Sequence, residues 1–169
     1  ATPDGKTLPL QWAAADAGFG PFLKEWKKLG AAVPLAAGGS RWFHLAHGGS
    51  PAVPERSAVA ESLAAMGERA RLVIVDDRAD TWGHDVHRWD QVLGTAEITR
   101  QAVPEDGPVF RRQRRWLTWG RSSVILDIVE WHALDAVELV LHIHWQDRRQ
   151  MLKLDLPLFI KEPELQVRT

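Results

Sequence analysis

The last third of the chain alternates between apolar and polar positions with the period of two that a half-buried β-strand shows. Across residues 137–145 the odd positions are apolar, whereas Glu138, His142 and His144 fall on even positions. After a short polar break, the alternation resumes across residues 152–160, with leucines on one face. We therefore predict two strands that pair with each other as an antiparallel hairpin.

Shorter apolar runs upstream predict further strands. Residues 72–75 and 123–131 are rich in β-branched residues and are bounded by glycine, serine or acidic residues, which is typical of core strands. Residues 41–45 lie between glycine pairs and predict another strand. Residues 109–119 contain four arginines that cannot all be buried, so we predict an edge strand or one that faces water.

Two segments show the spacing of a helix. Residues 57–70 are rich in alanine and begin with Ser57, a good N-cap, while Gly67 weakens the end of the segment. The expected apolar face consists of Val59, Leu63 and Met66. Residues 22–29 have a similar spacing of apolar side chains and predict a second, less regular helix.

Composition and length agree with one compact fold. The chain has 169 residues, of which 45% are hydrophobic and 25% are charged, as in ordinary soluble globular proteins. We predict an all-β fold, an antiparallel β-sandwich with one short helix. Along the chain we expect a small β-rich segment (residues 1–50), a linker or short helix (51–71) and the main β-sandwich portion (72–169).

Charge and cysteine content narrow the partners and the compartment. The net charge of -1 gives no overall field that would recruit nucleic acid or an anionic membrane, so we expect neither partner. The absence of cysteine and of an export signal predicts a cytoplasmic protein. The chain begins at Ala1 without an initiator Met, and we expect a segment of a longer polypeptide.

Four short pieces occur in an order that carries a family resemblance. Residues 76–85 read DDRADTWGHD and follow a predicted strand; residues 107–109 read GPV, and residues 120–123 read GRSS. Residues 145–157 contain a Trp, a polar turn, Leu-Lys and a final Pro. In this order the pieces resemble the β-rich C-terminal half of bacterial α-mannosidases of glycoside hydrolase family 38.

The resemblance implies a non-catalytic role. In that family a carboxylate nucleophile and a zinc ion held by His and Asp residues belong to an N-terminal α/β domain, and nothing in this chain matches that domain. We therefore expect no catalytic residue, no metal ligand and no cofactor in this chain. The resemblance implies that the chain packs against the catalytic domain of the same polypeptide and shapes the binding of a mannose-containing oligosaccharide.

The resemblance also points to one loop. In the resembling enzymes this loop lies on the part of the β region nearest the catalytic domain, so Asp80, Trp82 and His84 are the candidate cleft-facing residues. The chain departs from the family around residues 50–71, where the family has more strands. It also shows tryptophan where members often carry tyrosine, at Trp116, Trp119 or Trp131.

The residues alone leave alternatives open. The four aspartates of the acidic stretch could form a glycosidase carboxylate pair or act as turn and cap residues; they are Asp76, Asp77, Asp80 and Asp85. His142 and His144 share a strand face, which suits a cupin-like metal site or a pair of solvent-facing histidines.

Aromatic and basic residues carry two further hypotheses. Exposed tryptophans would make a free-standing carbohydrate-binding module, whereas buried ones would fill the core; the candidates are Trp82, Trp89, Trp116 and Trp119. The basic run at residues 111–115 could grip phosphate or nucleic acid, but we favour a solvated edge, because the chain is nearly neutral and lacks a matching signature.

Overall fold

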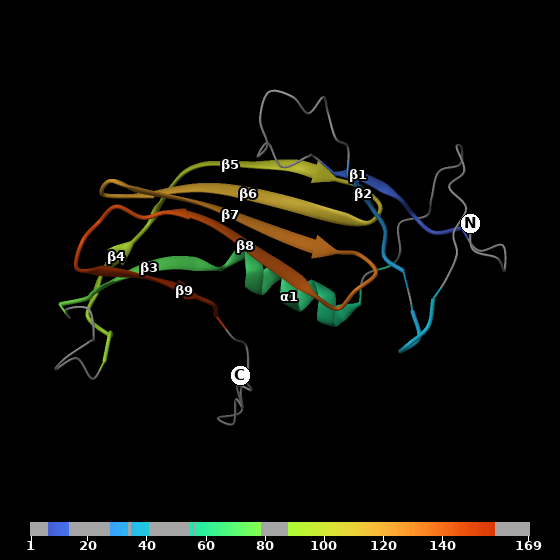
Figure 1. Ribbon diagram of the computed structural model, residues 1–169, viewed down its shortest axis with the longest axis horizontal. Helices are drawn as coiled ribbons and strands as arrows, with labels where there is room; N and C mark the ends of the chain where they lie inside the picture. Colours follow the sequence, from blue (N-terminus) through green and yellow to red (C-terminus); the bar gives the residue numbers. More distant parts are fainter. Residues whose placement is uncertain are drawn as a thin grey trace.

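The computed structural model describes residues 7–13, 28–33, 35–40, 55, 57–78 and 88–157. Its elements are β1 (Gln11–Ala13), β2 (Lys28–Gly30), α1 (Ala58–Glu68), β3 (Arg71–Asp76), β4 (Val92–Thr95), β5 (Glu97–Asp106), β6 (Phe110–Trp119), β7 (Ser122–Trp131), β8 (Val137–His144) and β9 (Gln150–Asp155). The long strands β5 to β8 form one layer, with β3, β9 and α1 beneath it (Figure 1).

Within the described residues every strand pair is antiparallel. The large sheet has the order β5-β6-β7-β8, the second sheet has the order β4-β3-β9, and β1 pairs with β2. The predicted all-β, antiparallel sandwich fold with a short helix is confirmed. The strands expected at residues 72–75 and 123–131 are β3 and β7.

The core lies between the two sheets. Leu72 and Ile74 of β3 face Leu126 and Ile128 of β7, and all four side chains have no exposed surface. Because side chains alternate along a strand, these residues all come from one face of each strand. Removing such a side chain from water contributes about 1.5–3 kcal/mol, which makes this layer the main source of stability.

The helix expected at residues 57–70 is confirmed as α1, and Ser57 is its N-cap. The Ala60 amide donates to Ser57 Oγ at 3.0 Å, which satisfies one of the free N–H groups at the helix start. The Ser57 hydroxyl in turn donates to Asp135, in the turn between β7 and β8. Helix start and large sheet are thereby joined.

The apolar residues that predicted this helix are not its most buried ones, since Leu63 and Met66 are only half-buried. The buried residues are Ala60, Ala64 and Gly67, whereas Val59 is 55% exposed. The reason is close packing on β7 and β8: a methyl group added at Gly67 would lie 3.0 Å from Ile128 Cγ2. Only small side chains fit between the helix and the sheet, so the larger residues lie at the sides of the contact.

The prediction that residues 109–119 form an edge or water-facing strand is also wrong. β6 lies inside the large sheet, between β5 and β7. Its arginines are half-buried or buried because neighbouring strands supply carboxylates for them. Asp127 and Glu130 of β7 and Glu105 of β5 are the carboxylates, and all three are buried.

The predicted hairpin of residues 137–145 and 152–160 does not form. β8 pairs with β7 in the large sheet, whereas β9 pairs with β3 in the second sheet. The chain crosses between the sheets after β8, and Arg149 takes a positive φ of 56° there. β8 and β9 turn their apolar faces to the same core from opposite sheets. Alternating apolar and polar residues are therefore compatible with strands in two different sheets as well as with a hairpin.

Other expectations fall partly or wholly outside the described residues. The helix predicted at residues 22–29 is wrong in its described part, because residues 28 and 29 belong to β2. The strand predicted at residues 41–45 lies outside the description, and the division at residues 50 and 71 stays a prediction. No helix within the described ranges is long and apolar enough to cross a membrane.

Candidate functional site

The described parts of three of the four family-like pieces meet at one end of the sandwich, at the left of Figure 1. This end, which we refer to as the turn end, comprises residues 76–78, 88–91, 119–122 and 145–150. It contains the end of β3, the β6–β7 turn and the crossover from β8 to β9. Hydrogen bonds between these segments define its geometry.

The Asp147 carboxylate joins the β6–β7 turn to the crossover. Ser122 Oγ donates to Asp147 Oδ2 at 2.5 Å, and the Arg121 amide donates to the same oxygen at 3.2 Å. Ser122 Oγ also accepts from the Gln146 amide at 2.8 Å. Gly120 has a φ of +52°, and a methyl group there would collide with Asp147. The turn therefore requires glycine for its conformation and for space.

A second set of bonds ties the crossover to the residues after β3. The Asp77 amide donates to the Arg149 carbonyl at 2.9 Å, and the Trp89 indole N–H donates to Asp77 Oδ1 at 2.9 Å. Lys153 of β9 donates to the Trp89 carbonyl. Asp77 and Trp89 flank residues 79–87, so this contact holds together the two described ends of that segment.

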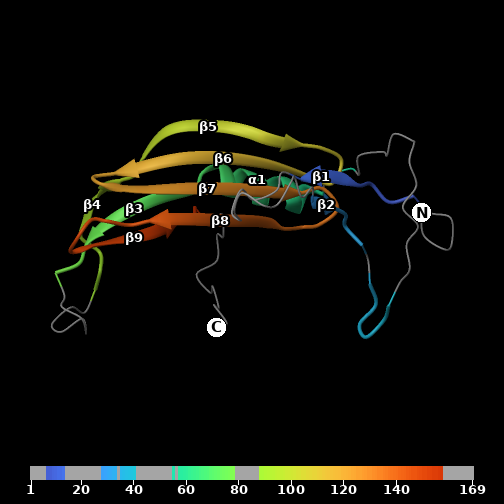
Figure 2. The ribbon, with the colours of Figure 1, turned by 45° about the horizontal axis from the view of Figure 1, so that its top comes forward.

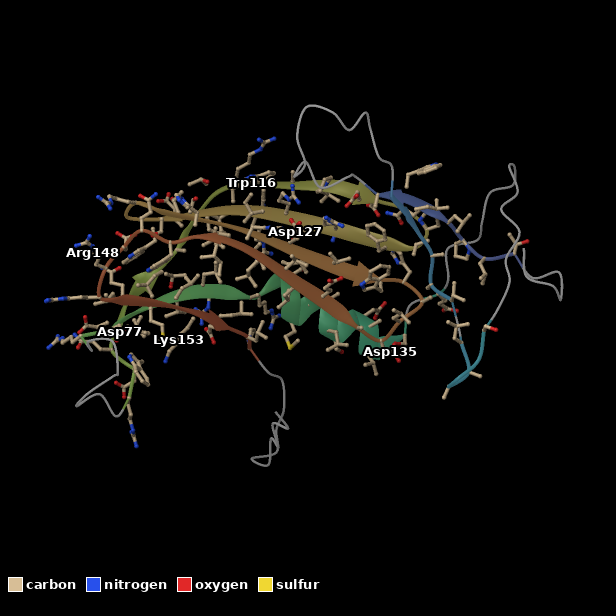
Figure 3. The ribbon with its side chains drawn as sticks, viewed as in Figure 1. Asp77, Trp116, Asp127, Asp135, Arg148 and Lys153 are labelled. Carbon is tan, nitrogen blue, oxygen red and sulfur yellow. The ribbon has the colours of Figure 1, made fainter. Side chains whose placement is uncertain are left out.

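Exposed cations surround these bonds. Three of the four carboxylates described at this end are engaged, whereas Asp90 is exposed: Asp76 pairs with Arg78, Asp77 accepts from Trp89 and Asp147 accepts from the β6–β7 turn. Four exposed guanidinium groups at this end pair with no carboxylate of the described residues; they belong to Arg88, Arg121, Arg148 and Arg149. Figure 3 shows Arg148, Asp77 and Lys153 at this end. Among the described residues, the turn end therefore presents more guanidinium groups than carboxylates to solvent.

The face of the large sheet that points away from β3 and α1, here named the outer face, carries an ion-pair network. Arg114 binds Asp127 in a bidentate manner, at 2.7 and 2.6 Å, and Asp127 is only 1% exposed. Arg112 lies 3.5 Å from Asp127 and 2.7 Å from Glu105. These charges are paired inside the sheet, so removing one partner would leave another charge buried without compensation.

Trp116 lies on the outer face beside this network (Figure 3). The guanidinium carbon of Arg100 lies 4.5 Å from its ring centroid and that of Arg114 lies 6.0 Å away. Both distances suit a cation–π interaction. Trp119 has a different role at the turn end, because its indole N–H donates to Gln150 Oε1 at 2.5 Å. Trp116, Trp119 and Trp89 thus each have specific intramolecular contacts.

Arg111 and Arg115 point to the inner face, toward α1. Arg115 donates to the Glu68 carbonyl at 2.8 Å, as expected for a cation at a helix C-terminus. Burial lowers the pKa of the Arg115 guanidinium, against the opposing effect of the nearby Glu68 carboxylate. Arg111 pairs with Glu130 at 3.0 Å. The basic run at residues 111–115 is therefore no solvated edge, and its charges are used within the fold.

The residues predicted for the site have unequal outcomes. Asp80, Trp82, His84 and Asp85 lie outside the described residues, so their proposed roles stay predictions. His142 and His144 are both exposed on β8, opposite Ile125 and Ser123 of β7. In the described ranges no group of three or more His, Cys, Asp or Glu side chains could hold a metal ion. The two histidines thus have no third ligand there.

Sequence reasoning missed a pocket at the other end of the outer face. Its volume is about 210 Å³. It is lined by Ala13, Leu29, Gly30, Phe110, Arg112, Val129, Trp131 and Glu138. These residues come from β1, β2, β6, β7 and β8. Their proximity depends on how the strands pair, which the sequence does not indicate. Trp131, the only aromatic residue of β7, was the available signal.

Comparison with known protein families, with curated proteins and with solved structures finds no match to this chain. The described residues place the protein in the class of antiparallel β-sandwiches with a short helix. Its function must therefore be argued from the residues and their contacts.

Proposed function

We propose that this chain is the non-catalytic β-sandwich part of an α-mannosidase resembling glycoside hydrolase family 38. In this role it packs against the catalytic domain of the same polypeptide and helps to shape carbohydrate binding. The carboxylate nucleophile and the zinc ion of the reaction belong to the catalytic domain. This chain holds a loop in place at the edge of the substrate-binding cleft.

The observation that supports the proposal most strongly is the meeting of three of the four family-like pieces, in their described parts, at the turn end. Residues 76–78, 120–123 and 145–150 are far apart in the sequence and were identified separately. They are joined by the hydrogen bonds of Asp77 and Asp147. A chance resemblance would have no reason to select segments that form one structural unit.

The turn end also suits the expected role of residues 79–87. The bond from Trp89 to Asp77 fixes the segment's described flanks on a rigid sheet, and Lys153 reinforces it from β9. A loop that shapes a cleft needs such support, because binding residues on loops depend on a rigid scaffold for their position. Under this proposal Asp80, Trp82 and His84 face the cleft.

The exposed cations of the turn end define the surface that the catalytic domain would meet. Arg148 and Arg149 lie in the crossover, next to the carboxylate of Asp147 that is already engaged. Complementary charge across an interface sets orientation and excludes wrong partners. We therefore expect acidic side chains on the matching surface of the catalytic domain.

The coding sequence upstream of Ala1 provides the first test. We expect it to encode an α/β domain with His and Asp zinc ligands, and we expect that domain, expressed separately, to bind residues 1–169. Binding should weaken as salt is raised and should fall at least about tenfold on replacing both Arg148 and Arg149 with Glu. Titration calorimetry measures both effects.

The matched control reverses a charge elsewhere. Arg69→Glu, at the end of α1 away from the turn end, should leave the affinity unchanged. An upstream reading frame without such a domain would contradict the proposal as a whole. Equal effects of the turn-end and Arg69 variants would contradict the placement of the interface.

A further inference from the structure

The pocket on the outer face is lined in part by β1 and β2. These two strands lie at the opposite end of β6, β7 and β8 from the turn end (Figure 2). At about 210 Å³ the pocket is smaller than the ~300–1,000 Å³ of pockets that hold drug-sized ligands. The pocket therefore has room for a small ligand with about one six-membered ring.

The strand register builds the floor of the pocket. Arg112, Val129 and Glu138 lie directly opposite one another on β6, β7 and β8. Since neighbouring strands are about 4.8 Å apart, the Arg112 and Glu138 backbones are separated by about 10 Å, with Val129 between them. In the next row along the same face, Phe110 and Trp131 form a tilted aromatic pair, with ring centroids 5.2 Å apart.

Strands β1 and β2 form the wall. Gln11 of β1 is buried, and its side-chain oxygen accepts from the Val109 and Phe110 amides at 3.0 and 2.8 Å. Gly30 of β2 lies so close to Phe110 that an added methyl group would be 3.2 Å from the ring. These contacts join segments about a hundred residues apart, so the wall is tied to the sheet by a specific buried bond.

Two polar groups at the pocket are available to a ligand. Glu138 is exposed and has no hydrogen bond or ion pair to the described residues. The ion pairs of Arg112 use its Nε and Nη1 atoms, on the side of Glu105 and Asp127, and leave Nη2 without a described partner. The pocket thus offers an anionic acceptor and a cationic donor on either side of an apolar, aromatic floor.

We propose that this pocket binds a single pyranose ring of a carbohydrate, with its C–H face on Trp131 and its hydroxyls between Glu138 and Arg112. A hydroxyl group both donates and accepts hydrogen bonds, so neighbouring hydroxyls of one ring can satisfy a carboxylate and a guanidinium. The apolar face of the ring suits an aromatic floor. The inference goes beyond the proposed function and does not depend on it.

Two-dimensional NMR of the tryptophan indole N–H groups tests the proposal on residues 1–169. The Trp131 signal is assigned with Trp131→Phe. Titration with methyl α-D-mannopyranoside, methyl β-D-glucopyranoside and an α-linked mannobiose should shift the Trp131 signal saturably with at least one of them. The Trp12 signal should not move, because this tryptophan is exposed but does not line the pocket.

Glu138→Ala is the decisive variant, because Glu138 is exposed and its removal leaves the core intact. It should weaken sugar binding at least about tenfold, since it removes a hydrogen bond to a charged group. Glu97→Ala, an exposed change on β5, should leave the affinity unchanged. Gln11→Ala should weaken binding as well, by releasing the wall.

Three results would overturn the inference. The first is no shift of the Trp131 signal at about 50 mM of any of the sugars, well above the ~1 mM dissociation constant of a weak ligand. The second is sugar binding that Glu138→Ala leaves unchanged. The third is a response of Trp131 to the zwitterion glycylglycine but to none of the sugars, which would assign the pocket to a peptide terminus. None of these results bears on the upstream catalytic domain.

Discussion

The two faces of the large sheet use the same three strands for different purposes. On the inner face, Leu126 and Ile128 of β7 are completely buried against β3. On the outer face, the intervening Asp127 holds Arg112 and Arg114 and is just as deeply buried. The inner face is aliphatic where it meets β3 and carries Arg111 and Arg115 only beside α1, whereas the outer face is covered by half-buried arginine side chains.

The difference shows how a charged face can be stable without a covering layer. Arginine stems cover the apolar surface of the sheet, and the side chains of Arg112 and Arg114 keep 20% and 28% of their surface exposed. The carboxylate beneath them is satisfied by a bidentate pair, so its burial leaves no unpaired charge. The outer face can therefore carry a ligand pocket without losing the fold, because the inner face supplies the stability.

The largest expected loss of stability comes from a substitution on the inner face. Leu126→Ala should lower the free energy of unfolding by about 2–5 kcal/mol, because a fully buried leucine leaves a cavity. Ile125, its neighbour, is half-buried on the outer face. Ile125→Ala should lower the free energy of unfolding by about half as much as Leu126→Ala. Urea denaturation measures both losses. Equal losses would mean that the two faces are packed to the same extent.

The second largest expected loss of stability comes from a substitution on the outer face. Asp127→Ala should cost about 3 kcal/mol, because two partly buried arginines lose their shared carboxylate. The matched control is Asp155→Ala, since Asp155 pairs with Arg71 where the side chains are 41% and 64% exposed. That change should cost less than about 1 kcal/mol. A similar cost for both variants would show that the outer network is not effectively buried.

A smaller effect tests how closely the helix approaches the inner face. Gly67→Ala should destabilise the protein by about 1–3 kcal/mol, because the new methyl group meets Ile128 and Val137 at 3.0 and 3.1 Å. Helix propensity alone predicts the opposite, a gain of about 1 kcal/mol. The sign of the change in thermal midpoint therefore decides between close packing and propensity.

The smallest effect concerns the helix cap. Ser57→Ala should cost about 1 kcal/mol, since the Ala60 amide loses its acceptor. Ser62→Ala, inside the same helix, should be neutral or slightly stabilising, because the Ser62 hydroxyl bonds the Ala58 carbonyl, which a helix does not need. Chemical denaturation of the two variants side by side checks this, and equal costs would contradict the cap.

Local elements were predictable, but their partners were not. The helix at residues 57–70 and the strand at residues 123–131 follow from spacing and composition. The pairing of β9 with β3 does not, because Leu152 would meet an apolar face in either sheet. The buried stripe of α1 also escaped prediction, since small residues become the contact only when a helix approaches a sheet closely.

The candidate site shows the same limit. The family-like pieces could be recognised in sequence, but the bond from Ser122 to Asp147 depends on the crossover between the sheets. Likewise, Arg112 and Glu138 flank one pocket only because β6, β7 and β8 pair in a particular register. The local sequence around Arg112 does not indicate that Glu138 lies nearby, nor does the sequence around Glu138 indicate Arg112.

Hydrolysis of 4-nitrophenyl α-D-mannopyranoside tests the central claim most directly. The polypeptide that includes the upstream reading frame should release 4-nitrophenol in a zinc-dependent reaction, whereas residues 1–169 alone should release none, with or without added zinc. Turnover by residues 1–169 that persists through purification would contradict the non-catalytic role. A longer polypeptide that binds zinc yet leaves every α-mannoside intact would contradict the assignment to an α-mannosidase.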